Sequence, residues 1–408
     1  MTPRRAGTVV WAAAAIVLLA LTLRIAVASL SPLLTVISRD FPLPAAVVGL
    51  IGMAPPVAFA LSAVVTPVIE RRVGLERLVL IAAVAAAVAL GLRAVAVGAW
   101  TLLAATAGVF AAVGVANVLI PAVVKKYFPE RVGLMTTVYT TTMAVATFTP
   151  PLVAVPLAGA IGWRGSFAVW AFVAVTAVAP WVVTSLRARA GRDDVVEEPR
   201  ASVLSRVVRV PQAWALVITF AVNSSVAYGM FAWLPTILID TAGVDAATAG
   251  SLLALFSFMG LPVSLVVPLL AARLRRTTPF YVFAVASGLA GVAGLLFAPG
   301  AATVLWVVLI GLPPLMFPMV LVLFSLRTRS HETAVALSGF VQSLGYALAA
   351  LVPLAIGVTH ELTGGWTAGL LVVGGVIVLV VPAAVVVARS ESIEEAWERR
   401  HGRAWDAG

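Results

Sequence analysis

The residue in this sequence best placed to do chemistry is Arg24, because it is the one charge inside a long apolar run. The run extends from Ala6 to Ser38. An apolar stretch of about 18 or more residues can cross the roughly 30 Å hydrocarbon layer as a helix. An arginine near its middle costs about 2.5–3.5 kcal/mol or more. A guanidinium in such a place prefers an anion or a strong hydrogen-bond acceptor, and this is the chemistry that we expect of Arg24.

The sequence offers Arg24 no carboxylate partner inside an apolar run. All 17 acidic residues fall in loops, at the ends of runs or in the tail. The remaining partners are a backbone carbonyl of a broken helix, a hydroxyl group or a bound substrate. If the run is one continuous helix, Arg24 shares a face with Ser31 and Thr35. We interpret Arg24 and Ser31 as substrate-binding residues, and the capping of a neighbouring helix by Arg24 is the alternative.

Further polar side chains recur in other apolar runs. Ser338, Gln342 and Tyr346 are spaced four apart, so they would form one stripe on a helix, and an amide and a phenol are costly to bury without partners. Thr140 has the alternative of bonding its own backbone, and Asn117 could bond a carbonyl freed by the proline four residues later. We predict that the substrate contacts also include Asn117, Tyr139, Thr140, Asn223, Tyr228, Gln342 and Tyr346.

Two residues are predicted near the outer ends of their runs. Arg93 lies about 24 Å beyond Arg77 at 1.5 Å per helical residue, so its long side chain can reach the outer interface. The alternative for Arg93 is a positive group at an outer mouth, where it would attract anions. Trp233, close to Pro235, is interpreted either as an interfacial anchor or as a gate.

The composition places the whole chain in a membrane. Of its 408 residues, 62% are hydrophobic and 11% are charged, so the polar surface of a soluble domain is missing. There is no cysteine, and the three histidines lie in loops or the tail. We therefore predict no catalytic set, no metal site and no cofactor. The net charge of +10 comes from bases clustered between apolar runs, which is typical of cytoplasmic loops and disfavours nucleic-acid binding.

Twelve apolar runs are separated by charged or Gly/Pro-rich turns. Lysine and arginine concentrate in alternate loops, which by the positive-inside rule predicts that both termini are cytoplasmic. The longest polar interval, 187–211, separates a half at 1–186 from a half at 212–389, with a tail at 390–408. The predicted spans are 8–38, 45–69, 78–98, 100–124, 133–158, 166–186, 212–239, 248–272, 278–298, 302–326, 333–358 and 367–388.

Two polar segments outside the spans carry their own signals. The segment SVLSRVVRV within 187–211 places valines and a leucine on one face, so it is interpreted either as a helix on the inner leaflet or as a plain tether. In the tail, Ser392 and Glu395 have the spacing of a capping box, which predicts a short helix.

The two halves repeat each other. With one common offset, Pro32 aligns with Pro235 and Trp163 with Trp366. A parallel repeat of six spans is typical of duplicated transporter folds. The predicted fold is an all-α membrane protein with twelve transmembrane helices in two pseudo-symmetric six-helix bundles.

Four segments of the chain carry a resemblance to a known family. They are LRIAVASLSPLL from Leu23, NVLIPAVVKKYFPERVGLMTTVYT from Asn117, YGMFAWLPTIL from Tyr228 and ALSGFVQSLGYALAALVPLAIGVTHELTGGW from Ala336. Through them the chain resembles the major facilitator superfamily, and within it the cyanate and nitroimidazole permeases. The loop after the second span, ERRVGLER from Glu70, departs from the superfamily's pattern because its glycine comes one residue late.

The resemblance implies secondary transport, by alternating access, of a cyanate-like or nitroimidazole-like solute. A monovalent anion that enters a cell with a negative interior climbs about 2.3 kcal/mol per 100 mV. Since no buried carboxylate is available to carry a proton, we expect downhill efflux, exchange, or entry of a neutral molecule or protonated acid.

Other functions remain open alternatives to this one. An exporter of hydrophobic drugs is favoured by the apolar lining and disfavoured by the central arginine. A membrane-embedded enzyme would need a buried acid, histidine or metal set, so we predict no enzymatic activity, and a receptor would bind without transport. We expect a multi-pass monomer in the inner, cytoplasmic membrane, whose partners are the lipid bilayer and a small-molecule substrate.

Overall fold

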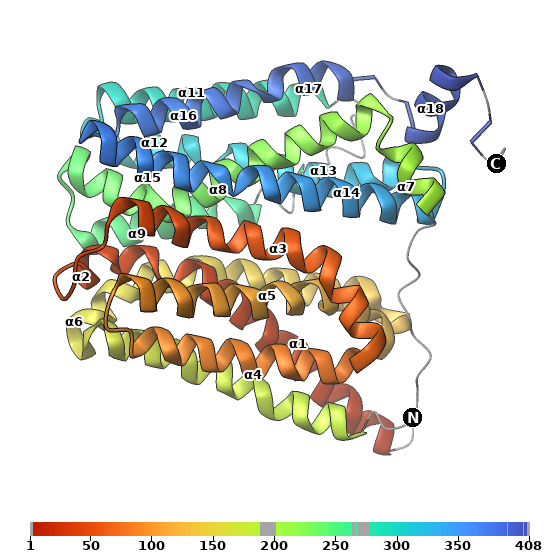
Figure 1. Cartoon of the computed structure of the whole chain (residues 1–408), viewed down its shortest axis with the longest axis horizontal. Coiled ribbons are helices and arrows are strands. Elements are labelled where there is room, and N and C mark those ends of the chain that lie inside the picture. Colours follow the sequence, from red (N-terminus) through yellow and green to blue (C-terminus); the bar gives the residue numbers. More distant parts are fainter. Residues whose placement is uncertain are drawn as a thin grey trace. The chain divides into compact units, whose positions relative to one another are not determined.

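The computed structural model of the chain describes residues 3–187, 201–262, 266–267, 277–389, 391–402 and 404–405. Throughout these ranges the regular elements are helices, with no strand (Figure 1). Ten helical segments are long and apolar enough to cross a membrane, and each of the twelve predicted spans overlaps a described helix. The chain is therefore an all-α, multi-pass membrane protein. The count of twelve crossings and the cytoplasmic side of the termini stay predictions.

The chain divides into two compact units, and one helix contributes to both. The first unit contains Met1–Val196 and Phe231–Phe258, and the second contains Glu197–Met230 and Met259–Gly408. Helix α8 (Pro211–Ala242) therefore begins in the second unit and ends in the first. The two bundles expected at 1–186 and 212–389 stay a prediction.

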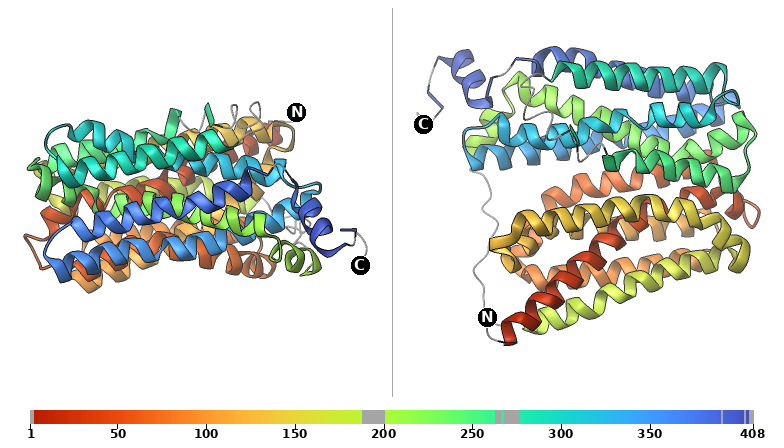
Figure 2. Two further views of the ribbon diagram at one scale, coloured as in Figure 1. Left: turned by 90° about the horizontal axis from the view of Figure 1, so that it is seen from above. Right: turned by 180° about the vertical axis from the view of Figure 1, so that it is seen from behind.

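The first unit is built from long apolar helices. Its α1 packs along α6, where Ile25, Ala146 and Trp170 form a buried cluster, and Figure 2 shows α1 beside the second half of α6 when seen from behind. Helix α3 packs along α5, and α4 packs along both α5 and α6. The elements of this unit are α1 (Pro3–Ala28), η1 (Ser31–Leu33), α2 (Leu34–Ile37), α3 (Ala45–Val73), α4 (Leu75–Ala94), α5 (Ala99–Tyr127), η2 (Pro129–Arg131), α6 (Val132–Arg187), the last part of α8 and α9 (Ala246–Phe258).

Helix α6 comprises two of the predicted spans, which meet at Gly162. This glycine has φ 74° and ψ 161°, a conformation that other residues adopt only with strain. The turn is fastened by its neighbours. Trp163 Nε1 and Arg164 Nη1 both donate to Asp40 Oδ2, at 2.8 Å and 2.7 Å, and the Arg164 guanidinium lies over the Trp163 ring. The loop between the first two spans is thereby joined to the turn in α6.

The first span is interrupted rather than continuous. Helix α1 ends at Ala28, and the chain passes through the short helices η1 and α2, with Pro32 at the start of η1. A proline has no amide hydrogen to continue a helical ladder, which explains a break at this place. The expected polar face that joins Arg24, Ser31 and Thr35 assumed one unbroken helix, and the break falls between Arg24 and Ser31. That these three side chains share a face stays a prediction.

Close packing surrounds this break. Helix α9 contacts both α6 and η1. At Gly250, an added Cβ would lie 2.7 Å from the Pro151 carbonyl oxygen and 3.7 Å from Pro32 Cβ. The glycine therefore permits α9 to approach the backbone of α6 beside the break in the first span.

The second unit follows the same construction from apolar helices. Within it, α11 packs closely on α12 and η3 by means of glycines spaced three apart, at 288, 291 and 294. Its elements are α7 (Ala201–Val207), the first part of α8, α11 (Thr278–Phe297), α12 (Thr303–Ile310), η3 (Pro313–Leu315), α13 (Met316–Leu326), α14 (His331–Ala349), α15 (Leu351–Thr363), α16 (Thr367–Val378), α17 (Val380–Val387) and α18 (Ile393–His401).

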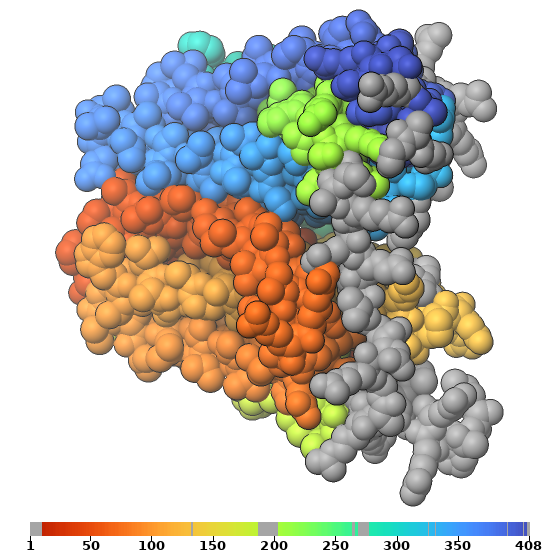
Figure 3. All heavy atoms as spheres, turned by 45° about the vertical axis from the view of Figure 1, so that its right-hand side comes forward, coloured from red at the N-terminus to blue at the C-terminus, as the bar shows by residue number. Residues whose placement is uncertain are grey.

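Helix α7 is packed against protein on the side that the sequence assigned to lipid. Val203 and Val207 are buried, and α7 contacts α14 and α18. In Figure 3 the green atoms at the start of the second unit lie against its blue C-terminal part. Its Arg206 donates to the Trp405 carbonyl and lies over the rings of Trp397 and Trp405. Leu204, which the sequence assigned to the same face, is 41% exposed. The interpretation of this segment as a helix on the inner leaflet stays a prediction.

The tail helix predicted from the capping-box spacing is confirmed. In α18, Ser392 and Glu395 make both bonds of the box. Arg329 pairs with Glu395 and with Glu398, at 3.2 Å each, and its amide donates to Glu394 at 2.9 Å. These charged contacts hold the tail on the loop between α13 and α14, and α18 also buries Ile393, Ala396 and Trp397.

We expect Gly294→Ala to destabilise the protein by about 1–3 kcal/mol, because overpacking of a filled interface costs that much. The new Cβ would lie 2.1 Å from the Trp306 ring, which a hydrogen bond from Nε1 to the Ala298 carbonyl holds in place. The measurement is the thermal unfolding of the purified protein in detergent. Gly375→Ala in α16 is the matched control, because nothing lies within 4 Å of its Cβ. Equal melting temperatures of the two variants would contradict the packing assigned to Gly294.

Docking of the tail should weaken in acid. The Ser392 amide and the Arg329 guanidinium hold the pKa of Glu395 below its ordinary value of 4.5. A carboxyl group whose pKa is lower in the folded state stabilises that state above its ordinary pKa, and the stabilisation is lost as the pH falls through the lowered value. We therefore expect a spin label on Ala404→Cys to become more mobile as the pH falls below about 4.5.

The same label should already be mobile at pH 7 in Glu395→Gln. Glu130→Gln, a change of an exposed acid in the first unit, serves as the control and should leave the label unaffected. A label that stays equally immobile at low pH and in Glu395→Gln would show that these charges do not hold the tail.

Candidate functional site

Arg24 lies half-buried on α1 in the first unit, four residues before the helix ends. Within the described ranges, its guanidinium has no hydrogen bond and no ion pair. It lies close enough to the Tyr139 hydroxyl on α6 to interact with it electrostatically. Asn117 on α5 is also half-buried, and its side-chain amide forms no hydrogen bond with the described residues. A cation and an amide without internal partners are available to bind a ligand.

Two other residues predicted in this unit have their hydroxyl groups engaged. Ser31 is 7% exposed and donates to the Ala232 carbonyl at 3.2 Å. Thr140 is exposed and donates to the Thr136 carbonyl at 2.8 Å, which is the alternative that the sequence left open for it. Neither hydroxyl is free in this structure to serve a ligand as a donor.

Arg93 is completely buried, so its expected reach to the outer interface is wrong. Its side chain has 0% exposure and points into the first unit. Nη1 donates to the Ala26 carbonyl at 2.9 Å, Nε donates to Thr106 Oγ1 at 3.1 Å, and the guanidinium lies 5.3 Å from the Phe110 ring centroid. Without exposed surface, Arg93 also cannot act as a positive group at an outer mouth. It performs the carbonyl capping that the sequence had suggested for Arg24.

Trp233 is also buried, at 3% exposure, within the part of α8 that belongs to the first unit. An interfacial anchor would face the surrounding lipid, so that interpretation is wrong. Its alternative role as a gate stays a prediction.

The second unit gathers several of the predicted residues around an aromatic cluster. Tyr346 on α14 packs edge-on against Phe220 of α8, with centroids 4.8 Å apart, and against Tyr228 at 6.2 Å. Gly345 lets α14 approach α8 closely, since its Cβ would lie 2.6 Å from Phe220 Cδ1. Phe220 was not predicted from the sequence, where one phenylalanine in a long apolar run gives no signal.

The polar members of this unit differ in how well they are paired. Gln342 donates from Nε2 to Ser338 Oγ at 2.7 Å, one turn away on α14. Asn223 is 4% exposed, and its Oδ1 has no hydrogen-bond partner among the described residues. Nearby on α8, Thr219 is fully paired, because its hydroxyl bonds both Tyr281 Oη at 2.9 Å and the Ala215 carbonyl. Asn223 therefore offers a buried acceptor that the described residues leave unpaired.

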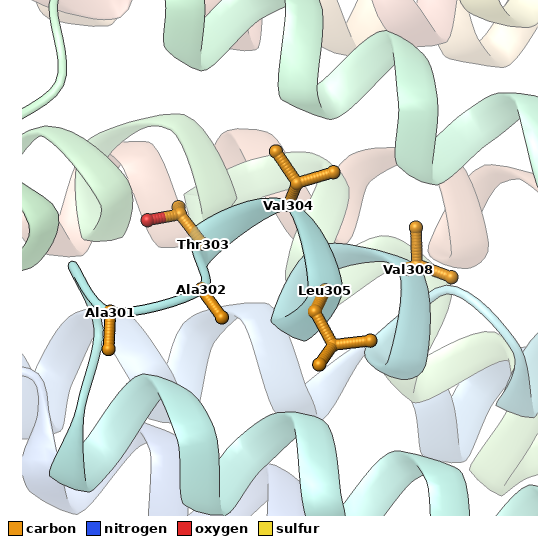
Figure 4. A pocket seen from close by; sticks show the side chains of 6 residues that line it. All are labelled: Ala301, Ala302, Thr303, Val304, Leu305 and Val308. Atoms are coloured by element: carbon orange, nitrogen blue, oxygen red, sulfur yellow. The ribbon is translucent and has the colours of Figure 1, made fainter.

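A hollow near the start of α12 has none of the features of a polar binding site (Figure 4). It is lined by Ala301, Ala302, Thr303, Val304, Leu305 and Val308. The Thr303 hydroxyl is engaged with the Pro299 carbonyl at 2.8 Å. None of these side chains is charged, so this hollow is not the place to look for an anion. Across the described part of the chain, no three histidines or acids gather in a way that could hold a metal ion.

Comparison with known proteins gives concordant matches. The model of the Major Facilitator Superfamily matches residues 16–350. An uncharacterized transporter of Bacillus subtilis, YycB, is 31% identical over 362 residues, which are 88% of each chain. The 2-nitroimidazole transporter of Escherichia coli is 31% identical over 360 residues, 88% of this chain and 90% of that one. The cyanate transport protein CynX of Escherichia coli is 28% identical over 260 residues, 62% of this chain and 65% of that one.

Solved structures show a similar fold. A bacterial homolog of the human lysosomal transporter Spinster, inward-facing and occupied, aligns with a TM-score of 0.76 at 15% identity and covers 97% of this chain and 99% of its own. The unoccupied form aligns with a TM-score of 0.73 at 15% identity and covers 96% and 98%. At this identity the likeness concerns the fold alone.

Thr219 and Asn223 lie on the same helix, α8, and differ in their hydrogen bonding, so we predict opposite effects on stability when each is replaced by an apolar residue. Asn223→Leu removes a buried oxygen that has no partner, so the ligand-free protein should keep its melting temperature or gain. Thr219→Val leaves the buried Tyr281 hydroxyl without its partner and should cost about 1–3 kcal/mol. Thermal unfolding of both variants without ligand is the measurement. A larger loss for Asn223→Leu than for Thr219→Val would show that Asn223 has an internal structural role.

Proposed function

The chain belongs to the Major Facilitator Superfamily of transporters, and on that basis we propose that it carries a small anion or a small nitrogen-containing solute, cyanate-like or nitroimidazole-like, by alternating access. The similarity to the 2-nitroimidazole transporter and to CynX supports this substrate class. We place the protein as a monomer in the cytoplasmic membrane, where a small molecule is its substrate.

One observation carries the proposal, the state of Arg24. Its guanidinium stands inside the first span without a hydrogen bond or an ion pair from the described residues. An arginine keeps its charge in proteins and offers five donors arranged to match a planar acceptor. Burial of a charge is costly unless it is paired. An anion or a strong acceptor such as a nitro group would supply the missing partner, so the substrate completes the site.

The other proposed contacts are residues with polar groups to offer. In the first unit, Tyr139 lies within electrostatic range of Arg24, and the Asn117 amide forms no hydrogen bond with the described residues. Ser31 and Thr140 stay proposed contacts, as acceptors, because each hydroxyl donates its hydrogen to a carbonyl and keeps its lone pairs. In the second unit, the proposed contacts are Asn223, Tyr228, Gln342 and Tyr346.

The energetics limit the direction of transport. An anion alone is driven out of a cell that is negative inside, by about 2.3 kcal/mol per 100 mV. Proton-coupled entry would need a group that carries a proton across, and the acids of this sequence fall outside the interior of the predicted spans. We propose downhill efflux, exchange, or entry of a neutral molecule or protonated acid.

Flux into proteoliposomes tests the role of Arg24. We expect Arg24→Gln to raise the KM for the transported solute about 10- to 100-fold, because a hydrogen bond to a charged group is worth about 1.5–3 kcal/mol. Arg24→Lys keeps the charge and should retain part of the affinity. Arg39→Gln, in the loop after the same span, should behave as the unaltered protein. The assay measures cyanate, 2-nitroimidazole and small carboxylates under separately imposed pH and voltage gradients.

Two results of this assay would overturn the proposal. Acid-driven uptake that survives in Arg24→Ala would remove Arg24 from the substrate site. Transport of hydrophobic drugs, with no flux of any small anion or azole, would replace the substrate class.

A further inference from the structure

We infer that Arg93 is a positioning residue for Arg24, which it holds in place by fixing the end of helix α1. The inference rests on the proposed function of Arg24 as the substrate's partner. It concerns a side chain that has no exposed surface and therefore cannot contact the substrate itself. Its effect must pass through the groups that it bonds.

Arg93 joins three helices of the first unit. It belongs to the last turn of α4, donates from Nε to Thr106 on α5, and donates from Nη1 to the Ala26 carbonyl on α1. The Phe110 ring of α5 packs against the guanidinium. The bond to Ala26, at 2.9 Å, attaches α1 to the pair of helices behind it.

The carbonyl of Ala26 needs a donor because of the break in the first span. The last four carbonyls of any helix lack an intrahelical partner. The Ser29 amide still donates to the Ile25 carbonyl at 3.1 Å, but within the described chain the Leu30 amide does not continue the ladder to Ala26. Arg93 takes the place of that amide. Its positive charge is also favourable at the negative end of the α1 dipole.

The burial of Arg93 is not explained by an acid partner. No ion pair among the described residues includes it, and its second terminal nitrogen, Nη2, is buried without a hydrogen bond to any of them. A buried cation that leaves one donor unused costs stability. A carbonyl cap by a neutral side chain would avoid much of that cost. Arg93 adds a long side chain that donates two hydrogen bonds, one to the Ala26 carbonyl on α1 and one to Thr106 on α5. These bonds fix both the end of α1 and the distance between α1 and α5.

The consequence falls on Arg24, two residues before Ala26. If Arg93 releases the Ala26 carbonyl, the end of α1 can fray or extend, and the guanidinium of Arg24 moves relative to Tyr139. The affinity of the substrate then changes without any change in the residues that contact it.

The absence of cysteine provides a direct test, since one introduced thiol can be labelled alone. The labelling rate of the thiol in Arg24→Cys with a charged, membrane-impermeant methanethiosulfonate is measured with and without Arg93→Met. We expect a change of about tenfold, the factor that corresponds to 1.4 kcal/mol. The thiol in Ser38→Cys, in the loop beyond the break, is the control and should label at an unchanged rate in both backgrounds.

Transport by Arg93→Met and Arg93→Lys gives the second readout. We expect Arg93→Met to raise the KM. The ammonium of Arg93→Lys can still donate to the Ala26 carbonyl, so the KM of this variant should be close to that of the unaltered protein. Both variants should have a similar kcat per folded transporter. Two results together would contradict positioning. If Arg93→Met has a normal KM and loses rate only in proportion to the folded protein, and if labelling at position 24 is unchanged, Arg93 has only a structural role. If labelling changes and the KM of Arg24→Gln is normal, positioning stands and the proposed function of Arg24 fails.

Discussion

A charged guanidinium inside a hydrocarbon layer must find polar partners, and this requirement organises the first unit of the protein. Two arginines lie within its spans and meet the requirement differently. Arg93 is paired internally with a carbonyl, a hydroxyl and an aromatic ring, although its Nη2 has no hydrogen bond with the described residues. Arg24 is not satisfied by the described residues. A side chain that keeps its charge and lacks a partner is unfavourable in the empty protein, and that cost is removed when a suitable ligand binds.

The break in the first span connects this electrostatic problem to the packing of the unit. On one side, Arg93 holds the Ala26 carbonyl just before the break. On the other, Ser31 within the break bonds the Ala232 carbonyl on α8, and Pro32 lies beside Gly250 of α9. A displacement of α8 or α9 would therefore act on the same short segment that sets the position of Arg24. The first span can in this way relate substrate binding to the movement of neighbouring helices.

The sequence predicts the spans well because apolar length is a property of consecutive residues. The turn between the two parts of α6 and the capped tail helix also depend on neighbouring residues in the sequence, and both were predicted.

The errors, and the points that the sequence leaves open, concern features that depend on residues distant in the sequence. The reach of Arg93 to the outer interface was predicted from its distance along the helix. Whether its side chain is exposed depends instead on which side of the helix it occupies, and the carbonyl that it bonds lies on α1. The valines of α7 have the pattern of a lipid-facing stripe, and the same pattern also suits the packing that α14 and α18 provide. The pairing of Phe220 with Tyr346 likewise joins helices far apart in sequence.

The binding of matched anionic and neutral ligands tests the central claim most directly, because it needs no assumption about direction or coupling. Purified protein is screened by thermal shift with cyanate, azoles and small carboxylates, each carboxylate beside its neutral amide, in the unaltered form and in Arg24→Gln. The account predicts that at least one anion or strong acceptor raises the melting temperature, that the matched neutral amide does not, and that Arg24→Gln abolishes the rise. An equal rise in Arg24→Gln, at the same ligand concentration, would contradict the account.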